Sequence, residues 1–256
     1  MKLAVFGDSF AAIKIGQEGT TKEKYHWPNI VAKMLNIDKH DNFALGGTSI
    51  DWSYMNFMKY HMNYDILIFV VTADSRSSII TEYPVNNFKH ICSFFAEQPL
   101  SYNEHLNDSV LKSPINNLID FKILKNELYK FKHYPSTHQL AHSAMRDSII
   151  HRRPDTILID AFPNVRSPLW TKEDESPCMY NIQIADFHNN GHFDRSKWTK
   201  MENKLQGDDE RFCHMTKSQN KKFAEYVYKH INEDNFDIHQ TLQINSIQNF
   251  YELSKL

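Results

Sequence analysis

Near its amino terminus the chain reads LAVFGDS from Leu3 to Ser9. The four apolar residues form a short continuous run, which is typical of a strand buried on both faces of a parallel sheet. Gly7 ends the run, and glycine permits the backbone conformation that a tight turn demands. The pattern therefore predicts a strand over residues 3–6 and a turn that carries Asp8 and Ser9.

Two later apolar runs have the same character, at residues 65–71 (DILIFVV) and 156–162 (TILIDAF). Both are rich in β-branched and aromatic residues, which favour strands. Segments with helical periodicity lie between these runs, at residues 29–35, 50–61 and 140–150. Because strands that alternate with helices imply crossover connections, the sequence predicts an α/β fold with a central parallel sheet.

Two of the predicted helices have assignable faces. In residues 140–150 the apolar side chains expected to share one face are Leu140, Ala144, Met145 and Ile149. The final clear helix begins at Thr216, whose hydroxyl can cap it while Gln219 reaches back in a capping box. The apolar stripe of that final helix consists of Phe223, Ala224, Val227 and Ile231.

Length and composition indicate one domain over residues 1–256. Apolar residues make up 41% of the chain and charged residues 23%, as in an ordinary globular domain of this size. Residues 75–135 have more polar spacer than a minimal βαβ unit needs, so we interpret them as an insertion. We expect a polar loop beside the functional site over residues 164–207, and a weak helix or loose tail over residues 233–256.

Charge and hydropathy exclude several classes of protein. The formal net charge is −2 with both signs mixed along the chain, so the basic stripe of a nucleic-acid-binding protein is missing. The apolar run at the amino terminus is too short for a signal peptide or a membrane span, and three distant cysteines suit a reducing compartment. We expect a cytoplasmic protein, or one released without a signal peptide, that binds neither nucleic acid nor membrane; a phage-type origin also fits.

Ser9 is a candidate nucleophile because ligands of open α/β sheets bind at the carboxyl ends of the strands. The alternative is that Asp8 and Ser9 merely cap a following helix. A serine hydroxyl needs a base to take its proton, and among the 14 histidines His214 directly precedes the final predicted helix. The GDDE loop at residues 207–210 offers acids that could orient this histidine.

Together these features resemble the GDSL/SGNH hydrolases. The resemblance rests on the GDS turn, on the NFALGG segment at residues 42–47 after a strand, on Trp27-Pro28 at the start of the first long helix, and on the histidine before the late amphipathic helix. It covers residues 1–74 and 155–231. It implies a flavodoxin-like three-layer α/β/α sandwich and a serine esterase that needs no cofactor.

The resemblance also implies roles for individual residues. Ser9 would be the nucleophile, and its backbone N–H and that of Gly47 would form the oxyanion hole. Gly46 would replace Gly47 if the turn is shifted by one residue. The residues expected to line the substrate site are Asp8, Thr72, Asp74 and Arg76.

His214 would be the general base of this site. The family usually places its acid three residues before the histidine, but residue 211 here is Arg. We favour Asp209 as the acid over Asp208, because a longer turn can still bring Asp209 to the imidazole. A Ser-His dyad, with a backbone carbonyl that orients the ring, is the fallback.

The block after the second apolar run also departs from the family. The family has Gly-x-Asn-Asp there, whereas this chain has VTAD at residues 71–74, so Ala73 replaces the oxyanion-hole asparagine. The missing donor would come from Thr72, from Arg76 or from an asparagine of another loop. Asp74 is expected to be structural rather than catalytic.

A metal site is a competing interpretation of residues 186–194. Asp186, His188, His192 and Asp194 are ligand types, and histidines four residues apart suit one helix face. The intervening NNG sequence favours a turn instead, so we predict a polar loop at the substrate entrance and no metal.

The leading hypothesis is hydrolysis of an ester or O-acetyl group through an acyl-enzyme, on a small molecule or a glycan. A second hypothesis passes the acyl group to a sugar hydroxyl, which would make the protein an O-acyltransferase. A third, motivated by Ala73 and the displaced acid, is a catalytically silent domain that binds a glycan or a protein.

Overall fold

The computed structural model describes residues 1–13, 25–38, 40–46, 48–72, 76–82, 88–95, 135–161, 179, 188–189, 192–193 and 215–242. The backbone alone is described for residues 76–82, 88–95, 135–139, 188–189 and 192–193. Several residues with predicted roles lie outside the described residues, namely Gly47, Ala73, Asp74, Asp186, Asp194, Asp208, Asp209 and His214.

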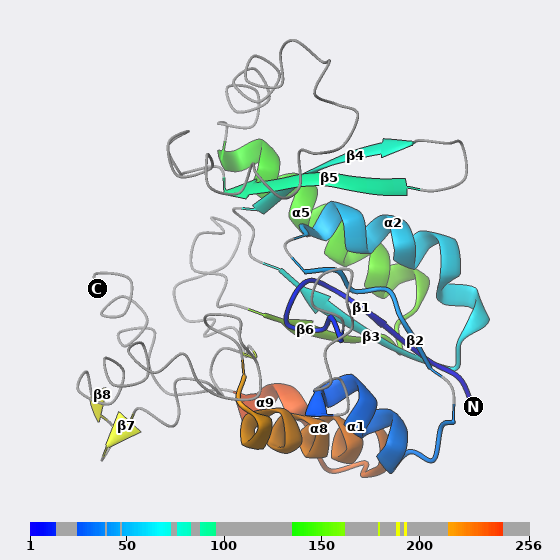
Figure 1. Cartoon of the computed structure of the whole chain (residues 1–256), viewed down its shortest axis with the longest axis vertical. Coiled ribbons are helices and arrows are strands. Elements are labelled where there is room, and N and C mark those ends of the chain that lie inside the picture. The colour runs from blue at the N-terminus through cyan, green and yellow to red at the C-terminus, as the bar shows by residue number, and fades with distance from the viewer. Residues whose placement is uncertain are drawn as a thin grey trace.

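Four strands form a parallel sheet in the order β2-β1-β3-β6 (Figure 1). Their bounds are Leu3–Phe6 for β1, His40–Asn42 for β2, Ile66–Val71 for β3 and Ile157–Asp160 for β6. The strands predicted near residues 3–6, 65–71 and 156–162 are therefore confirmed. Because all four strands run in the same direction, their carboxyl ends meet at one edge of the sheet.

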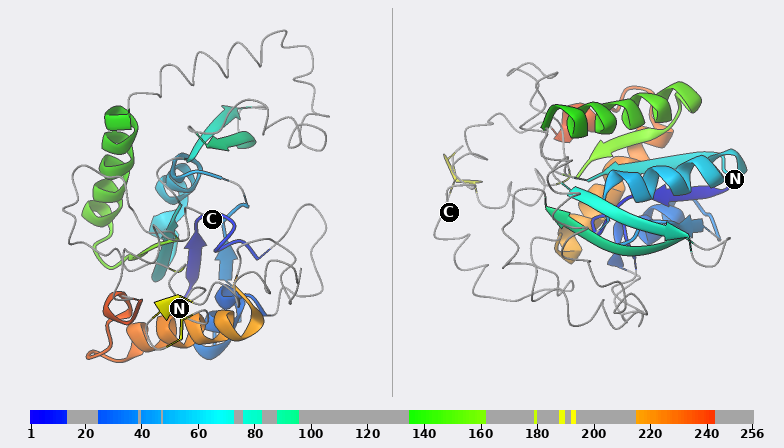
Figure 2. Two further views of the ribbon diagram at one scale, coloured as in Figure 1. Left: turned by 90° about the vertical axis from the view of Figure 1, so that its left-hand side faces the viewer. Right: turned by 90° about the horizontal axis from the view of Figure 1, so that it is seen from above.

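Helices cover both faces of this sheet (Figures 1 and 2). The helices are α1 (Trp27–Met34), α2 (Ile50–Tyr60, followed by the 3-10 turn η2 at His61–Asn63), α5 (Pro135–Arg152), α8 (Lys217–Asn232) and α9 (Ile238–Leu242). Side chains of α2 and α5 pack in one cluster with Ala4 and Phe6 of β1, whereas those of α1, α8 and α9 pack in another with Leu3 and Val5. Alternate residues of each strand thus face opposite helical layers, and the predicted α/β fold with a central parallel sheet is confirmed.

The buried face of α5 differs from the predicted one. Leu140 is 62% exposed and Ala144 is also exposed, so the prediction is wrong for these two residues. His142 and Ile149 are buried instead, and Met145 packs against the core beside them. Polar contacts explain the difference. His142 lies against Thr72 at the end of β3 and Arg146 pairs with Asp160, and these contacts favour the observed rotation of the helix.

The final helix begins as predicted. The Thr216 hydroxyl accepts a hydrogen bond from the Gln219 backbone N–H, and the Gln219 side chain accepts one from the Thr216 backbone N–H. Phe223, Ala224 and Val227 are fully buried, and Ile231 packs against the same cluster. The predicted capping box and apolar stripe are both confirmed.

The predicted insertion contains a feature that was not expected. Strands β4 (Arg76–Glu82) and β5 (Phe88–Phe95) pair as an antiparallel hairpin, and β4 contacts α2 outside the main sheet (Figure 1). A second short pair, β7 (His188–Asn189) and β8 (His192–Phe193), lies in the predicted polar loop. Among the helices in the described ranges, none combines the length and hydropathy needed to cross a membrane.

Candidate active site

The turn after β1 holds Ser9 at the carboxyl edge of the sheet. Gly7 adopts a φ of 149°, and a Cβ placed on it would lie 2.8 Å from the Val70 Cβ and 3.0 Å from the Ala11 Cβ. The Asp8 carbonyl then accepts hydrogen bonds from the N–H groups of Ala11 (3.1 Å) and Ala12 (2.9 Å). The prediction that this turn requires glycine is confirmed, and the turn leaves Ser9 8% exposed.

The Asp8 carboxylate fastens the turn to the end of β3. Its Oδ1 accepts a hydrogen bond from the Phe10 N–H at 3.0 Å, and its Oδ2 accepts one from the Thr72 hydroxyl at 2.7 Å. The Nε2 atom of His142 lies 3.3 Å from the Thr72 carbonyl oxygen. Asp8 is 0% exposed and Thr72 4%, so these contacts support a role in holding the turn.

The predicted substrate contacts of Asp8 and Thr72 stay predictions. Since a hydroxyl carries one proton and that of Thr72 points to Asp8, this arrangement does not offer it to an oxyanion. Asp74 lies outside the described residues, and Arg76 begins β4, whose backbone alone is described.

The loop after β2 runs beside the serine turn. The Phe43 N–H donates to the Val5 carbonyl at 2.8 Å and the Leu45 N–H to the Gly7 carbonyl at 3.1 Å, so this loop extends the pairing of β1 and β2. A Cβ placed on Gly46 would lie 3.7 Å from the Ser9 Cβ. Gly46, the alternative to Gly47 in the predicted oxyanion hole, thus lies against the candidate nucleophile.

Asn42 supports both sides of this junction. Its Nδ2 donates to the Ala11 carbonyl at 2.8 Å, and its Oδ1 accepts from the Ala44 N–H at 3.1 Å. One side chain therefore fixes the helix-like turn after Ser9 and the start of the glycine loop. Asn42 begins the NFALGG segment, but its own role was not predicted.

The start of α8 lies on the same face of the sheet as the residues after Ser9. Met215 is 3% exposed and belongs to the cluster of buried apolar side chains that also contains Phe10. His214 directly precedes Met215 in the sequence. Its catalytic role and that of the two candidate acids stay predictions, because those residues lie outside the described ones.

A partly buried ion pair lies at the same edge, at the end of β6. The guanidinium of Arg146 donates to both carboxylate oxygens of Asp160, and the two side chains are 12% and 11% exposed. The Met179 N–H donates to the Asp160 carbonyl at 2.8 Å. Sequence reasoning missed this pair and His142; the one available signal was the spacing of four between His142 and Arg146, which places both on one face of α5.

The metal interpretation stays untested, because the side chains of Asp186, His188, His192 and Asp194 lie outside the described ones. The residues whose side chains are described contain no group of three or more His, Cys, Asp or Glu residues that could hold an ion. In the antiparallel β7–β8 pair, His188 lies opposite Phe193 and Asn189 opposite His192. The predicted turn at Asn190 and Gly191 lies outside the described residues.

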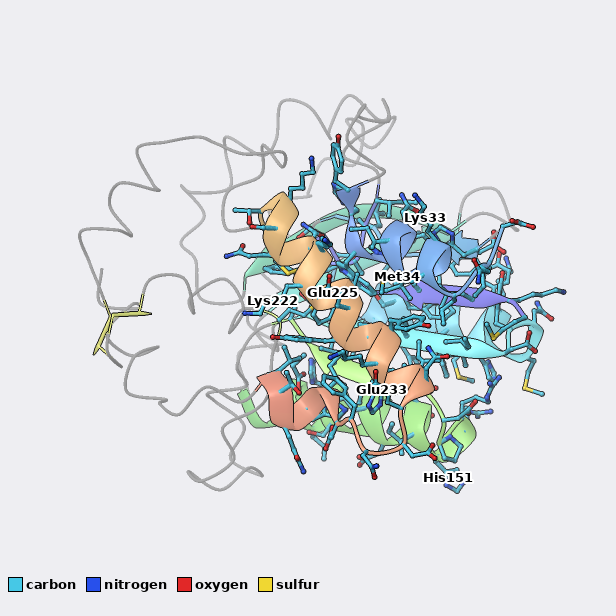
Figure 3. The ribbon with its side chains drawn as sticks, turned by 90° about the horizontal axis from the view of Figure 1, so that it is seen from below. Lys33, Met34, His151, Lys222, Glu225 and Glu233 are labelled. Atoms are coloured by element: carbon cyan, nitrogen blue, oxygen red, sulfur yellow. The ribbon has the colours of Figure 1, made fainter. Side chains whose placement is uncertain are left out.

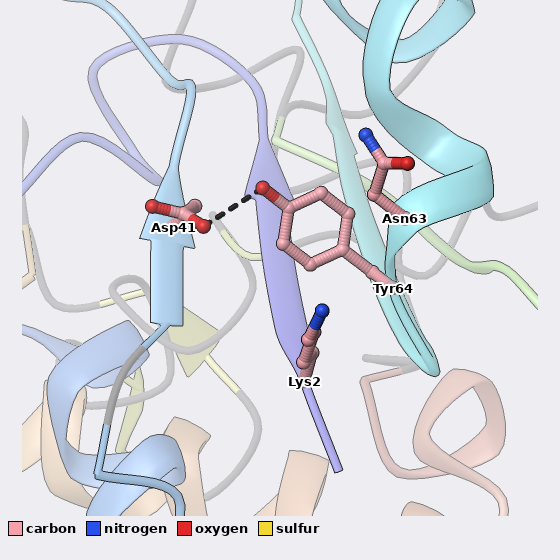
Figure 4. Close-up of a pocket in the computed structure, with 4 residues that line it drawn as sticks. All are labelled: Lys2, Asp41, Asn63 and Tyr64. Atoms are coloured by element: carbon pink, nitrogen blue, oxygen red, sulfur yellow. Dashed lines mark hydrogen bonds between the residues drawn. The ribbon is translucent and has the colours of Figure 1, made fainter.

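A small polar pocket lies at the opposite, amino edge of the sheet (Figure 4). Lys2, Asp41, Asn63 and Tyr64 line its volume of about 230 Å³. The Tyr64 hydroxyl donates to an Asp41 carboxylate oxygen at 2.8 Å. Burial, and then this hydrogen bond, raise the pKa of Tyr64 to about 12. The pocket is remote from Ser9 because Lys2 precedes β1 and Tyr64 precedes β3.

Replacement of Thr72 by valine tests the link between Asp8 and β3. The change removes a hydrogen bond to a buried carboxylate, so we expect the free energy of unfolding to fall by about 1.5–3 kcal/mol in urea titrations. Thr156→Val is the matched control, since Thr156 is 6% exposed and its hydroxyl has no hydrogen-bond partner among the described residues. Equal losses in the two variants would contradict the importance of the Thr72–Asp8 bond.

The lowered pKa values of two histidines make the free energy of unfolding depend on pH. Burial lowers the pKa of His40 and of His239 below the ordinary value of 6.5, against the opposing charges of Asp41 and Asp237 respectively. As the pH falls through that value, the unfolded chain binds protons that the folded chain resists, so stability should fall below about pH 6.5. In urea titrations the free energy of unfolding of His40→Asn/His239→Asn should fall less between about pH 7 and about pH 5 than that of the wild type. The control His151→Asn, at an exposed position, should lose as much as the wild type.

No protein-family model matches the chain, and no curated protein matches it. Fold and site together define a parallel α/β protein that holds a serine on a glycine turn at the carboxyl edge of its sheet.

Proposed function

We propose that this protein is a serine hydrolase that cleaves an ester or O-acetyl group through an acyl-enzyme, with a fold and active site of the SGNH type. The observation that carries the proposal is the meeting of two segments at one point: the tight turn at Gly7 holds Ser9 at the carboxyl edge, and the Gly46 loop lies against it. The strand order β2-β1-β3-β6 adds support, and so does the packing of Met215, which follows His214 in the sequence, in the same cluster as Phe10.

The proposed chemistry starts with attack by the Ser9 Oγ on the ester carbonyl carbon, while the hydroxyl proton passes to His214. The carbonyl oxygen becomes negatively charged, and the backbone N–H groups of Ser9 and of Gly47, or Gly46, stabilise it. Collapse breaks the bond to the alcohol oxygen, which takes the proton from His214. Water then attacks the acyl-enzyme by the same route, which releases the acid and restores the Ser9 hydroxyl.

Labelling with a fluorophosphonate probe tests this proposal. The Ser9 Oγ–P bond should form as the P–F bond breaks, with fluoride as the leaving group and the proton transferred to the base. We expect one label per folded chain, assigned to Ser9 by peptide mass spectrometry. Ser148→Ala, which removes a 2.8 Å contact with the Tyr54 hydroxyl away from this edge, should label normally.

Two results would refute the proposal. Folded wild-type protein that remains unlabelled would indicate a binding domain rather than a hydrolase. Labelling at a different serine would move the nucleophile away from the turn at Gly7.

A further inference from the structure

Two buried side chains connect the serine turn with the start of α8, although 193 positions separate them in the sequence. The Trp27 indole Nε1–H donates to the Phe10 carbonyl at 2.8 Å, and Phe10 directly follows Ser9. The Trp27 backbone N–H donates to the Asn220 Oδ1 at 3.0 Å. The Asn220 Nδ2 in turn donates to the carbonyl of Met215 at 2.9 Å, and Met215 directly follows His214. We call these contacts the Trp27–Asn220 bridge.

The bridge is buried. Trp27 is 1% exposed and Asn220 7%, and the Trp27 ring meets the Phe223 ring edge-on with centroids 4.9 Å apart. Next to the bridge, the Lys217 Nζ lies 3.9 Å from the centroid of the Tyr25 ring. Helices α1 and α8 lie side by side along their contact, as Figure 3 shows with Lys33 and Met34 on one and Lys222 and Glu225 on the other.

A local bond within α8 does not by itself explain the position of Asn220. An asparagine amide can bond to the carbonyl four residues before it, as Asn232 does to Tyr228 at 2.8 Å near the other end of α8. Asn220 makes such a bond to Thr216 at 3.1 Å, but it also reaches Met215 and accepts from Trp27. A polar side chain at a buried helical position is favourable only when its hydrogen bonds are satisfied, and here they join two separate segments.

We propose that Trp27 and Asn220 are positioning residues, which fix the spacing between the Ser9 hydroxyl and the His214 base. This inference rests on the proposed function. The bridge holds the backbone carbonyl on the carboxyl side of each reacting residue, at Phe10 and at Met215, so a shift of either segment changes the distance over which the proton moves. Errors of about 1 Å in such a distance can reduce rates about 100-fold.

The rate constant and the final extent of fluorophosphonate labelling test the inference, because they separate positioning from folding. Trp27→Phe keeps a ring against Phe223 and removes only the indole donor, so we expect about 10-fold slower labelling that still reaches one label per chain. Asn220→Leu removes both the acceptor for the Trp27 N–H and the donor to the Met215 carbonyl, so it should slow labelling about 100-fold. For p-nitrophenyl acetate, kcat should fall in parallel with KM unchanged within about twofold.

Asn232→Leu is the matched control, because it removes a side-chain bond of the same kind from the same helix, and it should label at the wild-type rate. Variants that label at the wild-type rate, to full or reduced extent, would overturn the positioning role while the proposed function stands. Wild-type protein that does not label at all would overturn both. If Asn220→Leu does not fold, the rate constant for Trp27→Phe decides.

Discussion

Replacement of Ser9 by alanine is expected to reduce turnover of p-nitrophenyl acetate by about 10⁴-fold or more, because the substitution removes the atom that attacks the carbonyl. The fold should be retained, since the Asp8 bonds to Phe10 and Thr72 do not involve the Ser9 hydroxyl. His214→Ala should cause a loss of similar size. The measurements are initial rates on purified protein and urea titrations of each variant.

The double variant provides the sharper test of this mechanism. If Ser9 and His214 act as one unit, Ser9→Ala/His214→Ala should be no slower than either single variant, because each single change already removes the unit's contribution. Ser148→Ala controls for a lost serine contact and should keep wild-type turnover. A Ser9→Ala protein that hydrolyses the ester at the wild-type rate would rule out the proposed nucleophile.

Much of the fold could be predicted because buried parallel strands leave a strong local signal. The runs at residues 3–6, 65–71 and 156–162 are mostly apolar, and each contains a strand of the sheet. The buried face of α5 could not be predicted in the same way. Periodicity counts apolar side chains, whereas Arg146 and His142 turn inward to meet Asp160 and Thr72, partners that are fixed only once the sheet exists.

In the candidate site, too, some features could be predicted from the local sequence and others could not. The glycine requirement before Ser9 follows from the strand-to-turn transition alone, and the proximity of Gly46 follows from the parallel pairing of β1 with β2. The Trp27–Asn220 bridge has no local signal, because neither side chain has an unusual spacing and their contact spans most of the chain. The sequence thus indicates the candidate reacting residues more easily than it indicates the residues that hold them in place.

Gly7→Ala should destabilise the protein more than any other single change at the turn. The φ of 149° is strained for any residue with a Cβ, which costs about 1–3 kcal/mol. The new methyl group would also lie 2.8 Å from the Val70 Cβ and 3.0 Å from the Val70 carbonyl oxygen, and such overpacking costs about 1–3 kcal/mol more. We therefore expect the free energy of unfolding to fall by about 2–6 kcal/mol in urea titrations.

Gly46→Ala separates this effect from a general intolerance of alanine at the site. Gly46 is exposed, and among the described residues its new Cβ would meet only the Ser9 Cβ, at an ordinary contact distance of 3.7 Å. Its stability should change by no more than about 0.5 kcal/mol. A Gly7→Ala protein as stable as Gly46→Ala would mean that β3 yields to the added methyl group. The turn would then not be rigid enough to hold Ser9 against the Gly46 loop, and the geometric argument for a prepared nucleophile would fail with it.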